Sequence, residues 1–550
     1  MLRRLIPVVI GITGLSVWLT AADAPLPEQR AAAKKQYDEG NFRDAWEIYQ
    51  KLARDDANSG KVLADDFSMA VQCLRNLQRQ NEIDEFREDV IEIHATDWRL
   101  LQQAALTLVH GEHYGFIVAG EFQRGQQRGG GEWADSTSRD RVRALQLLEQ
   151  ARPLAEQDEN KSEVALFYQH YANTLMFARS GIEAWRLQDL TNLEELPDYL
   201  RGYPWQRGFG SGSAKGAPVD AEGNPVFYSV PESYEAALND GERWRWCNAM
   251  VVEHNPGAAD GIKSQFAQFL RSQFGVQTMQ QWGIVLPSYA DGRDDDEDES
   301  GPYAVHTLGE DETITKLATG VKRITLPDEF NFIRIYQDLA QSGNRGYAES
   351  ALQQLSQISE DRQQYPQAAD YWRENIERFG PGQGNYKRQR LNQIVSNWGR
   401  FENVQSQAAQ TGATVEYRFR NGNKVHFTAH RIHVDKLLSD VKEYLQSAPK
   451  QLDWQTVQID NIGYRLVQQN EKEYLGDQVA EWDLELNPRD KHFDRRITVT
   501  TPLQDAGAYL VVGKMADGNV SRIILWVDDT VIAKKQLNGK AWYYVADAVS

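Results

Sequence analysis

The sequence predicts an α+β multidomain protein, in which an α-helical solenoid is followed by an antiparallel β-sandwich. Hydrophobic residues recur at helical spacing up to about residue 400, and they alternate at strand spacing from residue 411 onward. A chain of 550 residues is also too long for one hydrophobic core. We therefore expect a helical region at 25–400, a sandwich at 411–536 and the start of an incomplete second sandwich at 537–550.

The first 24 residues have the features of a secretory signal peptide. A basic start at 1–4 precedes an apolar run at 5–19, and small residues at 21–24 offer a cleavage site. The apolar run is shorter than the roughly 20 residues that a membrane span requires. We expect cleavage and export to the periplasm, the cell envelope or the extracellular space, with no stable membrane span afterwards. An uncleaved anchor is the alternative.

Charge and cysteine content narrow the function classes. The formal net charge of −19 argues against a nucleic-acid-binding protein and against a protein held on anionic lipid by its charge. The two cysteines, Cys73 and Cys247, are too few for a disulfide scaffold and lie in no metal-ligand spacing. Whether they pair is left open. No cofactor is expected.

The segment 31–54, AAAKKQYDEGNFRDAWEIYQKLAR, is the clearest part of the helical region. Two short helices around a Gly-Asn turn, with small residues spaced against large ones, are typical of a tetratricopeptide repeat. An ordinary helical hairpin is the alternative. A weaker echo lies at 351–376, and amphipathic helices are expected at 139–155 and 162–176. Such a solenoid usually presents a concave face to another protein.

Two irregular segments interrupt the expected solenoid. Residues 291–302 are acidic and fit a solvated loop, because the Gly and Glu of a calcium-binding loop are missing. Residues 201–232 are rich in Gly, Pro and aromatic residues. The aromatic residues could line a site for a protein, sugar or peptide, or they could anchor the loop by packing. They are Tyr203, Trp205, Phe209, Phe227 and Tyr228.

Alternation of polar and apolar residues begins near residue 411. Val415, Tyr417 and Phe419 form one predicted strand, and the strand that follows Asn421-Gly422 begins at about Val425. An Asn-Gly pair between alternating strands predicts a β-hairpin. One helix is expected at 434–446. Further strands are expected at 482–486, 495–501, 508–514, 520–527 and 530–535.

No pattern in the sequence predicts catalysis or metal binding. His426, His430 and His433 fall on the polar side of a predicted strand, and the two histidines of His110-Gly-Glu-His113 are not spaced to bind zinc from one helical face. The Gly-rich stretch 208–216 lacks the ending of a phosphate-binding loop. We therefore expect no catalytic residue, no metal and no enzyme activity.

The stretch ITVTTPLQDAGAYLVVGKMADGNVSRIILWVDDTVIAKK (497–535) resembles an early sandwich of bacterial alpha-2-macroglobulin-like proteins. Residues 543–549, YYVADAV, resemble the strand that opens the next sandwich in that family. Four upstream segments resemble the helical leader of planctomycete-type members. They are HYGFIVAGEFQRG (113–125), ERWRW (242–246), HTLGEDETI (306–314) and LPDEFNFIRIYQ (326–337). The resemblance implies a macroglobulin-type β-sandwich, preceded by the N-terminal region of such a protein.

The same resemblance implies a function. The chain would be a non-catalytic docking or scaffold module in protease inhibition or envelope defence, with proteases or envelope proteins as partners. Neither cysteine is followed by the Glu-Gln of the family's thioester motif, Cys-x-Glu-Gln, so that chemistry is not expected here. A self-sufficient solenoid–sandwich adaptor and an envelope hydrolase are the alternatives. A truncated or split chain would leave 537–550 poorly ordered, or loosely packed on the sandwich.

Overall fold

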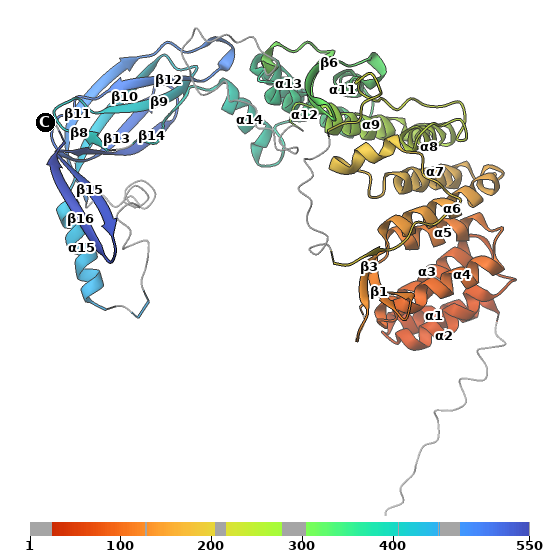
Figure 1. Cartoon of the computed structure of the whole chain (residues 1–550). Coiled ribbons are helices and arrows are strands. Elements are labelled where there is room, and N and C mark those ends of the chain that lie inside the picture. The colour runs from red at the N-terminus through yellow and green to blue at the C-terminus, as the bar shows by residue number, and fades with distance from the viewer. Residues whose placement is uncertain are drawn as a thin grey trace, which may run out of the picture. The chain divides into compact units, whose positions relative to one another are not determined.

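The computed structural model describes residues 25–126, 129–203, 216–277, 304–404, 406–448, 450–451 and 474–548. It contains helices and antiparallel sheets in two compact units (Figure 1), which confirms the α+β multidomain class. The first unit comprises 1–284 and 315–322, and the second comprises 285–314 and 323–550. The predicted signal peptide, the acidic loop at 291–302, Trp205 and Phe209 lie outside the described residues.

Helices that follow one another in sequence pack together in the first unit (Figure 1). They are α1 (Leu26–Asp38), α2 (Phe42–Arg54), α3 (Gly60–Asn76), α4 (Ile83–Ile93), α5 (Trp98–Val109), α6 (Thr137–Glu156), α7 (Lys161–Met176), α8 (Asp240–His254) and α9 (Ala259–Phe274). In α2 the buried residues Ala45, Tyr49 and Leu52 follow the predicted helical spacing. The N-terminus of α5 is capped by Asp97, whose carboxylate accepts hydrogen bonds from the backbone N–H groups of Arg99 and Leu100.

A small antiparallel sheet interrupts the helices of the first unit. Its strands are β1 (Tyr114–Val118), β2 (Glu121–Arg124), β3 (Glu132–Asp135) and β4 (Leu200–Arg201), in the order β2-β1-β3-β4. Three of the strands come from the segment between α5 and α6, and the fourth begins the aromatic-rich stretch predicted to be irregular. This sheet therefore positions Tyr203, which lies two residues after the end of β4.

Four α-helices precede the β-strands of the sandwich in the described part of the second unit. They are α11 (Phe332–Ala340), α12 (Arg345–Asp361), α13 (Tyr365–Phe379) and α14 (Tyr386–Val395). A two-stranded sheet, β5 (Glu312–Leu317) and β6 (Gly320–Thr325), precedes them in sequence. The α12 and α13 helices pack on each other where the sequence repeats the pattern of 31–54. The tetratricopeptide-like solenoid stays a prediction.

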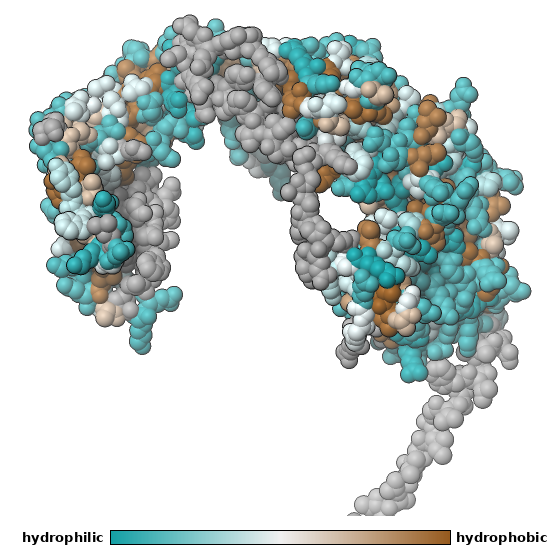
Figure 2. All heavy atoms as spheres, viewed as in Figure 1, coloured by the Kyte–Doolittle hydropathy of each residue, from teal (hydrophilic) through white to brown (hydrophobic). Residues whose placement is uncertain are grey.

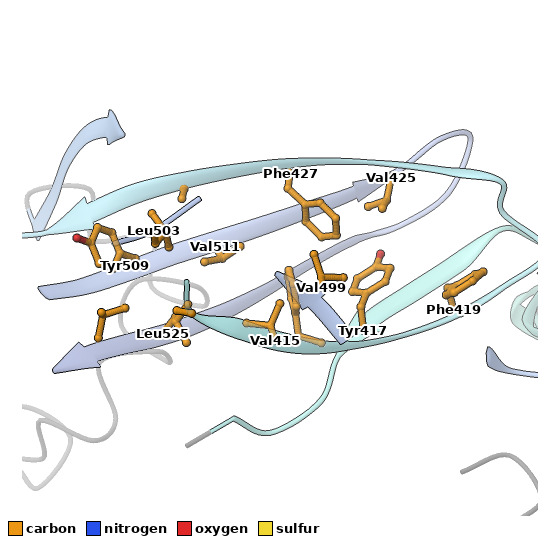
Figure 3. Close-up of a cluster of buried hydrophobic side chains, with 14 of the residues drawn as sticks. Val415, Tyr417, Phe419, Val425, Phe427, Val499, Leu503, Tyr509, Val511 and Leu525 are labelled. Atoms are coloured by element: carbon orange, nitrogen blue, oxygen red, sulfur yellow. The ribbon is translucent and has the colours of Figure 1, made fainter. Parts of the chain in front are cut away.

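Two facing sheets form a β-sandwich in the second unit. The order is β11-β10-β13-β14-β8 in one sheet and β12-β9-β7 in the other. The strands are β7 (Trp398–Phe401), β8 (Gln407–Ala408), β9 (Thr414–Arg420), β10 (Lys424–Ile432), β11 (Leu475–Glu485), β12 (Arg495–Thr500), β13 (Gly507–Met515) and β14 (Val520–Asp528). Figure 3 shows the side chains of Tyr417 and Phe427 pointing toward each other from the two sheets. Their rings meet edge to face, with centroids 5.4 Å apart and an angle of 81° between the ring planes. The predicted alternation therefore places one face of each strand in a shared core.

The predicted hairpin at Asn421-Gly422 is wrong. The strand before it, β9, pairs with β7 and β12, whereas the strand after it, β10, pairs with β11 and β13. Asn421 has φ +61°, and its amide donates hydrogen bonds to the carbonyls of Ile394 and Ser396. These contacts turn the chain from one sheet into the other. An Asn-Gly pair specifies a turn, and the pairing of the strands is set by the core.

The limits of the sandwich also differ from the predicted 411–536. It begins earlier, at β7, and its last strand is β14, which ends at Asp528. The α15 helix spans Val434–Gln446, as predicted, and buries Leu437 and Val441. The strand predicted at 530–535 belongs to neither sheet of the sandwich.

Candidate interaction surface

Residues 530–547 form a β-hairpin outside the two sheets of the sandwich. The β15 strand (Thr530–Leu537) pairs antiparallel with β16 (Lys540–Asp547). Gly539 has φ +73°, which suits a tight turn because glycine lacks the Cβ that penalises this conformation. At the base, the Ala548 N–H donates to the Asp529 carbonyl over 2.9 Å. Figure 1 shows the two arrows extending away from the sandwich.

Large apolar side chains on this hairpin are exposed. They are Val531, Ile532, Trp542, Tyr543, Tyr544 and Val545, each between 52% and 71% exposed. In Figure 2 hydrophobic residues, in brown, lie beside hydrophilic residues, in teal, in the region of β15 and β16. Leaving one such side chain in water forgoes roughly 1.5–3 kcal/mol relative to burial. A concentration of exposed apolar residues is typical of an interaction site.

The strand register divides these side chains between two faces. Residues directly opposite each other project to the same side of a sheet. Ile532 therefore shares one face with Val545. Tyr544 lies on the other face, opposite Ala533, and Trp542 lies there opposite Lys535. Neither face is covered among the residues that the structure describes, so the hairpin offers two apolar faces.

The sequence predicted the two strands of the hairpin but not their pairing with each other. The alternation of the sequence placed 530–535 in the sandwich and left a lone strand after it, whereas the structure pairs these two segments with each other. Asn538-Gly539 carries the same turn signal as Asn421-Gly422, and that signal could have identified the hairpin.

The aromatic residues predicted in 201–232 divide between separate surroundings. The Tyr203 ring stacks on Trp133 of β3, with ring centroids 5.5 Å apart. Phe227 packs on Phe274 at 5.1 Å, and Tyr228 is buried beside Phe269 at 6.1 Å.

Phe227 and Tyr228 line a cavity of about 10 Å³ next to α9, which has room for no more than a water molecule. Gly241 fits this packing closely, because a Cβ there would lie 2.4 Å from the Tyr228 ring. The described aromatic residues of 201–232 therefore act in packing, and this cavity is too small for a sugar or peptide.

A buried ionic cluster fixes the sheet that positions Tyr203. Arg124 of β2 donates two hydrogen bonds of 2.8 Å to the Asp140 carboxylate on α6, and its Nε lies 3.0 Å from Asp84 on α4. His113 and Ser136 also contact Asp140, at 3.0 and 2.7 Å. The cluster attaches the sheet to two helices, and sequence reasoning missed it because its members are dispersed along the chain.

The same contacts set the ionisation of Asp140. Burial raises the pKa of this carboxyl, but hydrogen bonds from His113, Arg124 and Ser136 and the charge of Arg124 outweigh burial. The net result is a pKa lowered to about 2. Asp140 is therefore a carboxylate at neutral pH and a full partner for Arg124.

His426, which was predicted to lie on the polar side of its strand, contacts two carboxylates there. His426 Nδ1 lies 2.8 Å from Asp483, and its Nε2 lies 3.4 Å from Glu481. Across the described ranges, no group of three or more His, Cys, Asp or Glu side chains could hold a metal ion. Cys73 and Cys247 are buried, free thiols, which answers the question of pairing that the sequence left open.

Part of this chain is similar to solved structures of a bacterial alpha-2-macroglobulin. A crystal structure of native alpha-2-macroglobulin from Escherichia coli spanning domains MG0-NIE-MG1 aligns at 14% identity and a TM-score of 0.20. The alignment covers 28% of this chain and 46% of that structure, so this chain spans less than half of the length of that structure. No family model matches the chain. No curated protein matches it either.

Two further structures come from the same protein. The crystal structure spanning NIE-MG1 aligns at 17% identity over 28% of this chain and 70% of that one, with a TM-score of 0.18. The cryo-EM reconstruction of the native conformation aligns at 16% identity over 28% of this chain and 9% of that one, also at 0.18. TM-scores of this size do not establish a shared fold.

Membrane-spanning helices require both length and a high content of apolar residues. Within the described ranges, no helix has enough of both to cross a bilayer.

Proposed function

We propose that the protein is an exported docking module that binds a protein partner through the β15–β16 hairpin. It would be the non-catalytic, N-terminal portion of an alpha-2-macroglobulin-like protein, in the service of protease inhibition or envelope defence. The docking role rests on one observation, the exposure of the six large apolar side chains on 530–547. The family assignment rests on the resemblance of 497–535, and export rests on the signal-like residues 1–24.

A binding role accounts for the hairpin better than a role in stability. A two-stranded sheet is marginal in water without cover for its apolar faces. Val531 on one face and Ile532 on the other are both more than half exposed. A partner that buries them would stabilise the hairpin and gain affinity in the same step. A self-sufficient adaptor would instead cover these residues with its own body.

The helical region supports the same role. Its helices pack as sequence neighbours in each unit, and a tetratricopeptide-like solenoid would add a second protein-binding surface. We assign no catalytic step to the chain. The hydrolase alternative gains no support from 201–232, where Phe227 and Tyr228 leave room for about one water molecule.

Site-specific photo-crosslinking tests the docking role in cells that export the protein. A photoreactive phenylalanine analogue at Tyr544, which is 71% exposed, should give a discrete adduct. The same analogue at Leu166 of α7, which is 52% exposed, is the matched control. A polar hairpin variant, Val531→Thr with Trp542→Ser, should lose the Tyr544 adduct. Identical adducts from both positions, or none from Tyr544, would contradict the docking role.

Export is tested separately. Residues 1–30 fused to alkaline phosphatase, which is active only outside the cytoplasm, should give an active enzyme. A variant with Leu5→Arg and Ile10→Arg interrupts the apolar run and should abolish that activity. Activity that survives in this variant would remove the support for export.

A further inference from the structure

The open edges of the hairpin limit what can bind it. The sheet contains β15 and β16, and no third strand joins it among the described residues. Hydrogen bonds alternate along an antiparallel pair, and the Ala548–Asp529 bond fixes which residues point inward. The N–H groups of Ile532 and Lys534 therefore face the open edge of β15. An unpaired edge of this kind is a template for another strand.

A lipid bilayer fits this hairpin poorly. Backbone groups at an open sheet edge would have no hydrogen-bond partner in the hydrocarbon core. Each face also carries a lysine within its apolar set, since Lys534 lies opposite Tyr543 and Lys535 lies opposite Trp542. A polypeptide strand satisfies the backbone edge and covers the apolar side chains together, which a bilayer does not.

The charge of the hairpin points to the sign of its partner. Residues 530–547 hold three lysines against one aspartate, a net charge of +2 in a chain of −19. Lys534 lies 5.8 Å from the centre of the Tyr543 ring. Within the described part of the chain, Lys534, Lys535 and Lys540 form no ion pair with a carboxylate. Two copies docked hairpin to hairpin would bring these like charges together, which disfavours a second copy as the partner.

We propose that β15 binds an extended, acidic segment of a partner protein by strand addition at its open edge. This deepens the proposed function and rests on it, because it names the chemistry of the partner at the same hairpin. In an added strand of alternating sequence, carboxylates would lie on one face beside Lys535 and apolar side chains on the other beside Ile532, or carboxylates beside Lys534 and apolar side chains beside Val531. Neighbouring side chains on adjacent strands come within about 5 Å, which suits both kinds of contact.

Direct binding of synthetic peptides to the full-length protein tests this. Fluorescein-labelled (Val-Glu)4 should bind, as measured by anisotropy, and binding should weaken as NaCl rises. The (Val-Lys)4 peptide has the same apolar content and should bind at least about tenfold more weakly because of its charge. A (Val-Glu)4 peptide N-methylated at every residue has no backbone N–H left to donate, so it cannot pair with the edge of β15 and should not bind.

Matched protein variants locate the site. The double variant Lys534→Glu with Lys535→Glu should bind the basic peptide more tightly than the acidic one. The variant Lys540→Glu, which changes a lysine beside the turn, should still bind the acidic peptide more tightly. Fluorine NMR of 5-fluorotryptophan protein, with Trp542 assigned through Trp542→Phe, should show that resonance shifting as (Val-Glu)4 is added. The same spectra verify that each variant remains folded.

Three results would overturn the inference. They are equal binding of the acidic and basic peptides, equal binding of the N-methylated peptide, and a Trp542 shift with phosphatidylglycerol vesicles but with no peptide. The last result would identify a lipid surface. If Tyr544 gives a discrete crosslink but the acidic peptide binds no better than the basic or the N-methylated peptide, the docking role stands and an acidic strand is rejected as the partner. Absence of both crosslink and peptide binding would reject the two proposals together.

Discussion

The guanidinium of Arg124 donates two hydrogen bonds of 2.8 Å to the carboxylate of Asp140. Both side chains are buried, with 5% of Arg124 and 4% of Asp140 exposed. This pair connects the small sheet of the first unit to α6. Because both side chains are buried, the charge of Arg124 depends for its compensation on Asp140 and on the more exposed Asp84. Loss of either partner should therefore be costly.

Replacing Asp140 by Asn should lower the free energy of unfolding of the protein by about 3 kcal/mol, because it leaves the buried Arg124 charge with only the more exposed Asp84 as a counter-charge. Urea unfolding measures the loss. Asp38→Asn is the control, since Asp38 and its partner Lys34 are both more than half exposed. That variant should change the free energy by less than about 0.5 kcal/mol. Equal losses in the two variants would show that burial of the Arg124 pair does not matter.

The stability of the protein should also depend on the protonation of Asp140. Its pKa is lowered in the folded state from 3.8 to about 2, so the contribution is present above about pH 4 and is lost as pH falls toward 2. The full contribution is about 2 kcal/mol. The difference in urea stability between the parent and Asp140→Asn should be constant from pH 7 to 5 and should shrink below pH 4. A difference that grows on acidification would contradict this assignment.

Removing the hairpin should cost the sandwich little. Deletion of 529–550 is expected to change the free energy of unfolding by less than about 1 kcal/mol, because the hairpin adds no side chain to the sandwich core. Deletion of 520–550 is the control, since it also removes β14 with the buried residues Leu525 and Val527. A large loss of stability on the shorter deletion would mean that the hairpin completes the sandwich.

Gly422 should accept a side chain only if Met515 moves away. A Cβ at this position would lie 2.2 Å from the Met515 sulfur, so Gly422→Ala should destabilise the protein by about 1–3 kcal/mol through overpacking. The penalty should be smaller in a Met515→Ala background, which a double-mutant cycle measures. Gly343→Ala is the control, because nothing lies within 4 Å of a Cβ there. An equal penalty with and without Met515 would place the strain elsewhere.

The two cysteines should be free and slow to react in the folded protein. Burial raises the pKa of the Cys73 thiol to about 11, and burial also raises the pKa of Cys247 well above its usual range. Little of either thiol is therefore the reactive thiolate at pH 7.5. Alkylation should modify neither cysteine in buffer and both in urea without reductant. A count below two thiols in urea would indicate a disulfide that the structure lacks.

The periodicity of the sequence predicted individual elements well. The α15 helix matches the predicted 434–446, and the strands predicted at 495–501 and 508–514 agree with β12 and β13 within one residue at each end. Both results follow from local spacing, because one face of each element is buried and the other is solvated. Such spacing identifies an element but not its neighbours.

The pairing of strands could not be read from the same signals. Asn421-Gly422 and Asn538-Gly539 look alike in sequence, yet the first joins two sheets and the second closes a hairpin. The difference arises from the core, where Tyr417 and Phe427 meet from opposite sheets. The sequence predicted a further strand after residue 537 but not an interaction surface there, and the strand that pairs with it was assigned to the sandwich. The alternation on β15 did not reveal which sheet it joins.

The short crossing at 421–423 has a kinetic consequence. Strands on opposite layers of a sandwich are usually distant in sequence, and closing a longer loop between them costs more chain entropy. Here β9 and β10 reach opposite layers through three residues, so Phe419 and Val425 can meet early at little entropic cost. The crossing thus supplies a local nucleus for an otherwise non-local topology. Because the crossing lowers the contact order, the sandwich should fold faster than its non-local strand pairing alone would suggest.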